Sequence, residues 1–343
     1  MIMKFKIFLF NILLLFTLLF IGELGVRIFF PKKINYQRTY PGEYKNKDFD
    51  SLTTVVTWPK FSYKLGWVCN NQVKELKFSN PLYNNLNIKY SINNSGFRYH
   101  NGILSNTTKE IMILGDSFVF GVYLNDTSTI PYLIQNLLDN KYNVCNLGIP
   151  GWGLDQMYLS YLFYARSTGT QNIIIFFIDD DIYRVLEAYR FTEGMNKPSL
   201  KINNGYLELR MNDSRNVLEF LLQKSKLLNP IYKWYCETQA IKISKKIFLT
   251  LKVETLKKKQ NFLVVHIPVI EQVLYPDKYE NLIDNNYFNK NYINYLDIKE
   301  NFKKINKQVV KGFYLKDDGH LTEKGAEIVA KIVINKLSKY DDK

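Results

Sequence analysis

The distribution of apolar residues predicts alternating strands and helices from about residue 109 to the C-terminus. Ile173–Ile178 is an uninterrupted apolar run, which is typical of a strand buried on both faces of a parallel sheet. Four further candidate strands are Ile111–Leu114, Tyr142–Leu147, Phe262–Ile267 and, more weakly, Tyr292–Leu296. Because helical patterns separate these strands, we predict an α/β fold with a parallel sheet covered by helices on both faces.

The segments between the predicted strands repeat their apolar residues at helical spacing. Helices are predicted over Ile130–Leu138, Leu154–Arg166 and Leu321–Leu337. Ser128 is the predicted N-cap of the first helix, and Pro131 fits the first turn of that helix.

Two regions depart from this alternation. Residues 31–105 have mixed polarity and several turn signals, which predicts an irregular or β-rich lead-in. Within the main domain, residues 106–343, we predict an insertion near residues 187–258. The insertion contains a hairpin signal at Asn203-Asn204-Gly205 and a basic helical stretch from Asn216 to Lys259. Insertions of this kind often shape a substrate site.

The N-terminal segment has the pattern of a membrane anchor. Ile7–Gly22 carries no charge, and Lys4 and Lys6 precede it. These 16 residues are slightly short for a bilayer core, but flanking apolar residues extend them. No small-residue cleavage site follows, so residues 1–30 are predicted to be a signal anchor, with a cleaved signal peptide as the alternative. We therefore expect a single-pass protein of the inner (cytoplasmic) membrane whose main domain is periplasmic or extracellular.

The charge of the chain does not favour nucleic-acid binding. The formal net charge is +14, but lysines are scattered among Asn, Ile and Tyr rather than gathered with arginines on one face. Affinity for an anionic envelope polymer or lipid surface stays open. The three cysteines and three histidines have no metal-ligand spacing, and no glycine-rich phosphate loop is present. The sequence therefore implies neither a metal nor a cofactor.

Two separated motifs carry candidate chemistry. Ser117 follows a predicted strand within Leu114-Gly115-Asp116-Ser117-Phe118, at the sheet edge where α/β folds place reactive groups. His320 is the candidate base, and Asp317, three residues earlier, is the predicted orienting acid. Asp318 is the alternative acid. The competing interpretation is that these residues only cap the helices that follow them.

Four ordered blocks in this chain resemble those of the SGNH or GDSL hydrolase superfamily. The blocks are Gly115-Asp116-Ser117, Asn146-Leu147-Gly148-Ile149-Pro150-Gly151, Ile178-Asp179-Asp180-Asp181 and Asp317-Asp318-Gly319-His320. The similarity covers about residues 109–337. It implies a three-layer, flavodoxin-like fold that catalyses ester hydrolysis or acyl transfer.

Carried over by position, the resemblance implies a nucleophile at Ser117 and a triad completed by Asp317 and His320. It also implies an oxyanion hole formed by Ser117, Gly151 and residue 180. The family has an Asn donor at this last position, whereas this chain has Asp180. A carboxylate cannot donate a hydrogen bond unless it is protonated. Three hypotheses follow: burial keeps Asp180 protonated, another residue supplies the donor, or the site binds without turnover.

Two other residues have open roles. Arg184 is expected to meet an anionic substrate or to pair with Asp179 or Asp181. His266 ends a predicted strand, and we interpret it as a structural histidine rather than part of the site.

These features predict a membrane-anchored serine esterase or O-acyltransferase acting on an O-acylated cell-envelope glycan or a related ester. Hydrolysis and transfer both stay open. One alternative is a catalytically impaired glycan-binding or assembly protein, which Asp180 favours. The other alternative is a membrane lipid esterase, which the predicted anchor favours.

Overall fold

A computed structural model of the chain describes residues 2–29, 59–70, 88, 90–99, 109–139, 141–166, 169–187, 189–190, 195–210, 225–316 and 318–341. The chain divides into two compact units. One unit comprises residues 1–39 with 213–239, and the other comprises residues 40–212 with 240–343.

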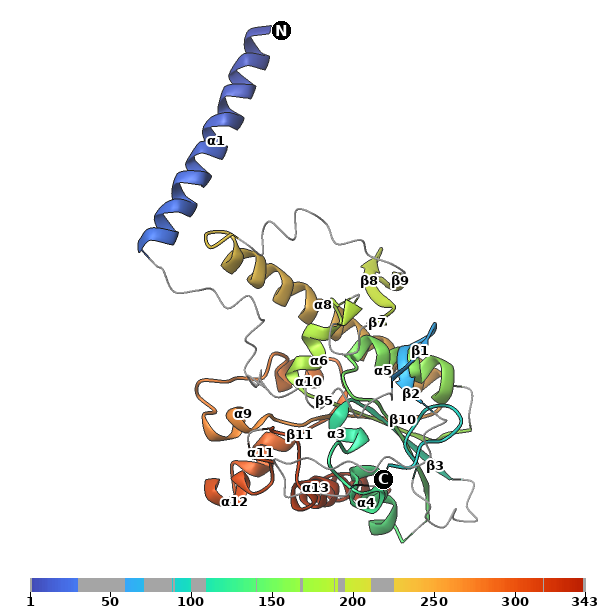
Figure 1. Cartoon of the computed structure of the whole chain (residues 1–343). Coiled ribbons are helices and arrows are strands. Elements are labelled where there is room, and N and C mark those ends of the chain that lie inside the picture. The colour runs from blue at the N-terminus through green and yellow to red at the C-terminus, as the bar shows by residue number, and fades with distance from the viewer. Residues whose placement is uncertain are drawn as a thin grey trace. The chain divides into compact units, whose positions relative to one another are not determined.

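The larger unit is built on a five-stranded parallel sheet in the order β11-β10-β5-β3-β4. Figure 1 labels β3, β5, β10 and β11 of this sheet. The strands are β3 (Glu110–Gly115), β4 (Asn143–Gly148), β5 (Asn172–Phe177), β10 (Asn261–His266) and β11 (Asn294–Asp297). Each predicted strand lies within two residues of an observed one. The chain first adds β4 on one side of β3 and then β5 on the other, so the order reverses between β3 and β5. In such doubly wound sheets this reversal opens the crevice that holds the functional site.

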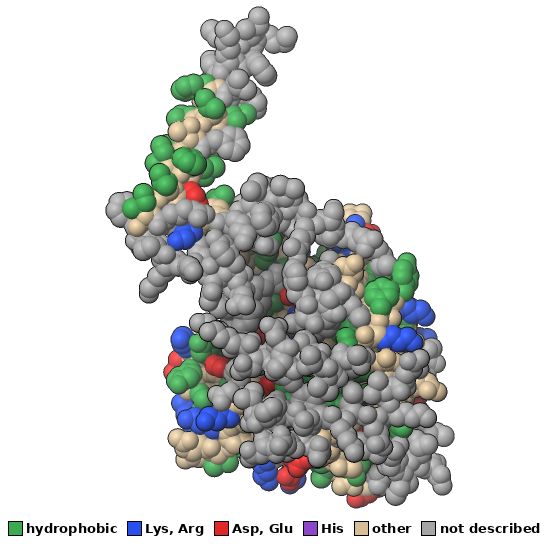
Figure 2. Space-filling model, in the orientation of Figure 1, with side chains coloured by type: hydrophobic (Ala, Val, Ile, Leu, Met, Phe, Trp, Pro, Cys, Tyr) green, Lys and Arg blue, Asp and Glu red, His purple; other side chains and the backbone are tan. Residues whose placement is uncertain are grey.

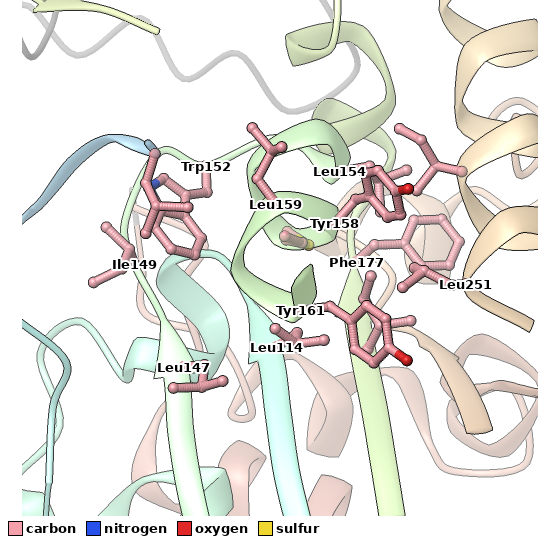
Figure 3. Close-up of a cluster of buried hydrophobic side chains, with 14 of the residues drawn as sticks. Leu114, Leu147, Ile149, Trp152, Leu154, Tyr158, Leu159, Tyr161, Phe177 and Leu251 are labelled. Carbon is pink, nitrogen blue, oxygen red and sulfur yellow. The ribbon is translucent and has the colours of Figure 1, made fainter. Parts of the chain in front are cut away.

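Helices cover both faces of the sheet, so the fold has three layers. Alternate residues of β5 point to opposite faces: Ile173, Ile175 and Phe177 join one buried cluster, and Ile174 and Phe176 join the other. The first cluster packs against α5 (Leu154–Ser160) and α8 (Asn229–Lys257), and Figure 3 shows part of it. The second packs against α4 (Ile130–Leu137), α11 (Ile298–Phe302) and α13 (Glu323–Asp341).

The predicted helix boundaries need two corrections. The N-cap of α4 is Thr129 rather than Ser128, because the Thr129 hydroxyl accepts the amide of Tyr132. The Ser128 hydroxyl instead donates to the carboxylate of Glu323, at 2.8 Å. The helix predicted over Leu154–Arg166 is interrupted, since α5 ends at Ser160 and a π-helical turn, η3 (Tyr161–Ala165), continues it.

Short hairpins occur in the two regions predicted to be a lead-in and an insertion. The lead-in contributes β1 (Pro59–Ser62) paired with β2 (Gly66–Cys69). The insertion contains β6 (Tyr189–Arg190) with β7 (Met195–Asn196), and β8 (Ser199–Asn203) with β9 (Tyr206–Arg210). The turn between β8 and β9 places Asn204 and Gly205 at φ 47° and 81°, as expected for the Asn-Gly hairpin signal.

The remaining short helices connect these elements. They are α3 (Ser117–Phe120), η2 (Asp126–Ser128), α6 (Asp179–Arg184), α9 (Ile270–Leu274), α10 (Asn285–Lys290) and α12 (Lys307–Lys311).

The smaller unit contains the N-terminal helix α1 (Ile2–Phe29). The Glu23 carboxylate accepts hydrogen bonds from the Ser225 hydroxyl and from the amides of Lys226 and Leu227, at 2.8–2.9 Å. Hydrophobic side chains are exposed along α1 (Figure 2). Among the residues whose placement is described, no helix is long and apolar enough to cross a membrane. The transmembrane helix predicted for residues 1–30 is not confirmed.

Candidate active site

Ser117 lies at the tight connection between β3 and α3. It is the first residue of α3, and the preceding residue, Asp116, caps that helix by accepting the Phe118 amide at 2.9 Å. A side chain at Gly115 would place its Cβ 2.3 Å from a Val119 methyl carbon, so only glycine allows α3 to fold back on the strand. Ser117 is 8% exposed. The Gly-Asp-Ser sequence thus holds a nearly buried hydroxyl at the carboxyl edge of the sheet.

A chain of contacts joins Ser117 to His320 and Asp318. Nε2 of His320 lies 2.8 Å from Oγ of Ser117. Nδ1 of His320 contacts Oδ1 of Asp318, which also accepts the backbone amide of His320 at 3.1 Å. The acid observed on the imidazole is Asp318, the alternative; Asp317, the predicted orienting acid, lies outside the described residues. Gly319, at φ 86°, makes the turn that folds the ring back onto Asp318.

Tyr123 is a neighbour of His320 and Asp318 that the sequence did not indicate. Its ring meets the His320 ring edge-on, with centroids 5.8 Å apart, and its side chain hydrogen bonds to Asp318. Its backbone has φ 65°, which is unfavourable for a bulky residue, and its amide donates to the hydroxyl of Tyr90 at 2.9 Å. Strained residues of this kind cluster at functional sites. Its only sequence signal is its position two residues after Gly121.

The two members of the ion pair shift each other's pKa. Burial lowers the pKa of His320, but the adjacent Asp318 carboxylate outweighs burial, so the pKa lies above its ordinary value of 6.5. Burial raises the pKa of Asp318, but the His320 charge and the hydrogen bonds to the carboxylate outweigh it and lower the pKa. This arrangement stabilises an imidazolium, the form that a general base becomes after accepting a proton.

The backbone amides of Ser117 and Gly151 are the donors predicted for the oxyanion hole. In the part of the chain that the structure describes, the amides of Ser117 and Gly151 have no hydrogen-bond acceptor. Gly151 has φ 79°, a conformation that favours glycine. The buried Asn146 supports this region, since its Nδ2 donates to the Val119 carbonyl and its Oδ1 accepts the Gly148 amide, both at 2.9 Å.

The third motif block, Ile178-Asp179-Asp180-Asp181, packs around Arg184. It has no Asn side chain that could donate as a neutral amide. Oδ2 of Asp180 lies 3.8 Å from Nη2 of Arg184, and the Asp180 side chain is 19% exposed. Nη1 of Arg184 donates to Asp116 Oδ2 at 3.3 Å, to the Trp152 carbonyl at 3.2 Å and to Asp181. Oδ2 of Asp181 also accepts the Ile178 amide at 3.0 Å. The predicted pairing of Arg184 with Asp181 is therefore observed.

Burial and the nearby Asp116 carboxylate raise the pKa of Asp181 well above its usual range. Burial lowers the pKa of Arg184. The carboxylates of Asp181, Asp180 and Asp116 outweigh burial and raise this pKa above its ordinary value. The guanidinium therefore stays charged and compensates several carboxylates at once.

His266 belongs to a separate buried cluster. Its Nε2 lies 3.3 Å from Asp179 Oδ1, and its Nδ1 lies 3.4 Å from Asp297 Oδ1. Asp179 also accepts a hydrogen bond from Gln272 at 2.6 Å. Burial lowers the pKa of His266, but the two carboxylates outweigh it and raise the pKa to about 9. His266 thus links the ends of β10 and β11 to the start of α6, as expected for a structural histidine.

His266 is expected to make folding stability fall at alkaline pH. Its pKa of about 9 exceeds the unfolded value of 6.5, so its contribution is complete below pH 6.5 and is lost as pH rises through 9. The shift corresponds to roughly 3 kcal/mol. Urea unfolding of the wild type and His266→Gln from pH 6 to 9.5 measures this contribution. Parallel pH dependences of the two proteins would contradict the assignment.

Among the described residues, no group of three or more His, Cys, Asp or Glu side chains is arranged to hold a metal ion.

The comparisons with known proteins find similar solved structures only. No family model matches the sequence, and none of the curated proteins matches it. Several solved structures do. An acetyl xylan esterase, AlAXEase, is 14% identical with a TM-score of 0.41, over 66% of this chain and 98% of its own. A lipase/acylhydrolase from Enterococcus faecalis is 10% identical, with a TM-score of 0.41 over 68% and 96% of the two chains.

A third structure is a putative lipolytic protein of the G-D-S-L family from Desulfitobacterium hafniense. It is 13% identical with a TM-score of 0.41, over 65% of this chain and 97% of its own. The chain resembles the SGNH or GDSL hydrolases. This resemblance consists of the four motif blocks in the sequence and the parallel sheet that carries them.

Proposed function

We propose that this protein is a serine hydrolase of the SGNH type that cleaves or transfers an ester-linked acyl group. The contact between Ser117 and His320, continued to Asp318, is the observation that carries the proposal. A hydroxyl within 2.8 Å of an imidazole that is itself held by a carboxylate has the geometry of an activated nucleophile.

In the proposed reaction, Oγ of Ser117 attacks the ester carbonyl carbon while its proton passes to Nε2 of His320. The carbonyl electrons move to the carbonyl oxygen, which the amides of Ser117 and Gly151 receive. The tetrahedral intermediate then expels the alcohol, which takes the proton from His320. Water completes hydrolysis of the acyl-enzyme, whereas an acceptor hydroxyl in its place completes a transfer.

The proposed substrate is an O-acylated cell-envelope glycan or a related ester. The uncharged N-terminal run and the exposed hydrophobic side chains of α1 support a location beside a membrane. The net charge of +14 supports affinity for anionic envelope polymers. A membrane lipid ester is the second candidate substrate, which the exposed hydrophobic side chains of α1 favour.

Labelling with a fluorophosphonate tests the proposed chemistry without assuming a substrate. We expect the full-length protein to be labelled on Ser117, because the reagent requires an activated hydroxyl, and Ser117→Ala to remain unlabelled. Ser160, which is buried in α5, provides a matched control, and Ser160→Ala should be labelled like the wild type. A folded wild type that resists the reagent would favour the catalytically impaired glycan-binding alternative.

We also propose that residues 1–30 attach the protein to the cytoplasmic membrane, with the larger unit on its outer side. Membranes containing the full-length protein are expected to retain it through an alkaline carbonate wash, and a chain lacking residues 1–30 should be released. Release of the intact full-length chain would overturn the proposed attachment. Protease protection in spheroplasts measures the side on which the larger unit lies.

A further inference from the structure

Arg184 contacts a neighbour of each residue expected in the oxyanion hole. Its Nη1 donates to Asp116, which directly precedes Ser117, and to the carbonyl of Trp152, which directly follows Gly151. Its Nη2 faces Asp180 at 3.8 Å. Oδ2 of Asp116 lies 3.3 Å from both Nη1 of Arg184 and Oγ of Ser117, so one carboxylate oxygen bridges the guanidinium and the nucleophile.

The guanidinium retains donors that its own contacts do not use. All three hydrogen bonds of Arg184 to described residues come from Nη1. Among the described residues, Nη2 forms only the ion pair with Asp180, and Nε donates to none of them. The side chain is 13% exposed, and its hydrogen bonds and ion pairs to three carboxylates and a carbonyl hold it in place.

The site needs such a donor because residue 180 cannot serve as one in its ionised form. An ionised Asp180 only accepts hydrogen bonds and would repel a developing oxyanion. The adjacent positive charge of Arg184 offsets this repulsion. A guanidinium also carries five N–H donors in a fixed geometry, which suits an anionic oxygen.

We propose that Nη2 of Arg184 supplies the side-chain donor of the oxyanion hole, and that Asp180 orients this nitrogen instead of donating itself. This inference rests on the proposed esterase function and deepens it. When Oγ of Ser117 bonds to the carbonyl carbon and its proton moves to His320, the electron pair of the carbonyl π bond moves to oxygen. That oxygen then accepts hydrogen bonds from the amides of Ser117 and Gly151 and from Nη2 of Arg184.

Turnover of 4-nitrophenyl acetate by Arg184 variants tests this role. Arg184→Met removes every donor at similar length, so kcat is expected to fall by about 100-fold to 1,000-fold with KM nearly unchanged. Arg184→Lys keeps the charge without the forked geometry, so its kcat should fall by roughly 10-fold or more. Circular dichroism establishes folding, and Arg184→Lys carries the test if Arg184→Met does not fold.

A boronic acid provides a second readout of oxyanion binding, one that does not depend on the acyl-transfer steps. Phenylboronic acid forms a tetrahedral anionic adduct with an active serine. Its affinity should therefore fall in the Arg184 variants by the same factor as kcat/KM. Asp180→Asn should change turnover by less than about 10-fold. A rise in kcat of about 100-fold or more in Asp180→Asn would show that position 180 supplies the donor, and it would overturn the proposal.

Two further outcomes would also overturn it. Wild-type kcat in both Arg184 variants would show that the guanidinium does not touch the oxyanion. A raised KM confined to an anionic ester, 4-acetoxybenzoate, would instead assign Arg184 to substrate charge. In both cases the wild type is labelled by a fluorophosphonate and only the role of Arg184 fails. If the wild type is neither labelled nor active, the esterase function fails and this role fails with it.

Discussion

Asp318→Asn is expected to lower kcat for ester hydrolysis by about 10,000-fold, the size of effect seen when a triad acid becomes an amide. The amide keeps the shape of the side chain but no longer stabilises the imidazolium of His320. It also favours the wrong tautomer, because Nδ1 of His320 then faces a group that can donate. Initial rates with an activated acetyl ester measure the loss.

Asp317→Asn is the matched comparison, since it removes the same charge one residue earlier in the chain. The contact between His320 and Asp318 predicts that Asp317→Asn keeps most of the wild-type rate. A large loss in Asp317→Asn together with near-normal activity in Asp318→Asn would return the orienting role to Asp317.

The pH dependence of kcat/KM provides a second measure of the same pair. Because Asp318 raises the pKa of His320, the acidic limb of the wild-type profile is expected above pH 6.5, where the neutral base forms. In Asp318→Asn, burial of the ring is no longer opposed by the carboxylate. The residual activity should therefore have its acidic limb at lower pH than the wild type.

The sequence predicted the central strands well because β3, β5 and β10 are buried on both faces. Continuous apolar runs such as Ile173–Ile178 have few competing interpretations when turn signals flank them. The observed strand β5, Asn172–Phe177, differs from this run by one residue at each end. Ser117 and His320 stood out in the sequence because one follows a buried strand and the other precedes the last helix, and the structure brings Oγ and Nε2 within 2.8 Å. Their catalytic roles stay predictions.

The choice between Asp317 and Asp318 could not be made from spacing. A separation of three residues suits a helical turn, but the chain here bends at Gly319 with φ 86°. This turn lets Asp318 accept both the ring and the backbone amide of His320. Tyr123 escaped prediction for a similar reason, because its contact with Asp318 depends on a left-handed backbone conformation that its residue type does not favour.

The role of the lead-in became clear only from long-range contacts of Arg98. This residue precedes the sheet, and its 1%-exposed side chain pairs with Asp126 at 2.8 Å. It also donates to the carbonyls of Phe120, Gly121 and Leu124, at 2.6–2.9 Å. These acceptors lie on both sides of Tyr123. Arg98 therefore holds the loop that carries Tyr123 against His320 and Asp318.

Arg98→Met is expected to lower the free energy of unfolding by about 3–5 kcal/mol, because it leaves Asp126 without its buried counter-charge. Three carbonyls lose their donor as well, while the methionine retains much of the packing between the rings of Tyr90 and Phe120. Urea unfolding of the full-length protein in detergent measures the loss, and the melting temperature should fall by roughly 10 °C.

Arg166→Met is the matched control for this prediction. Arg166 pairs with Glu254 at 3.0 Å, but its side chain is 46% exposed, so its removal is expected to change stability by about 0–1 kcal/mol. Below its melting temperature, Arg98→Met should also lose esterase activity, since the loop carrying Tyr123 is no longer fixed behind Asp318. Equal stabilities of the two variants would show that Arg98 does not clamp this loop, and the strained backbone of Tyr123 would then require another source of support.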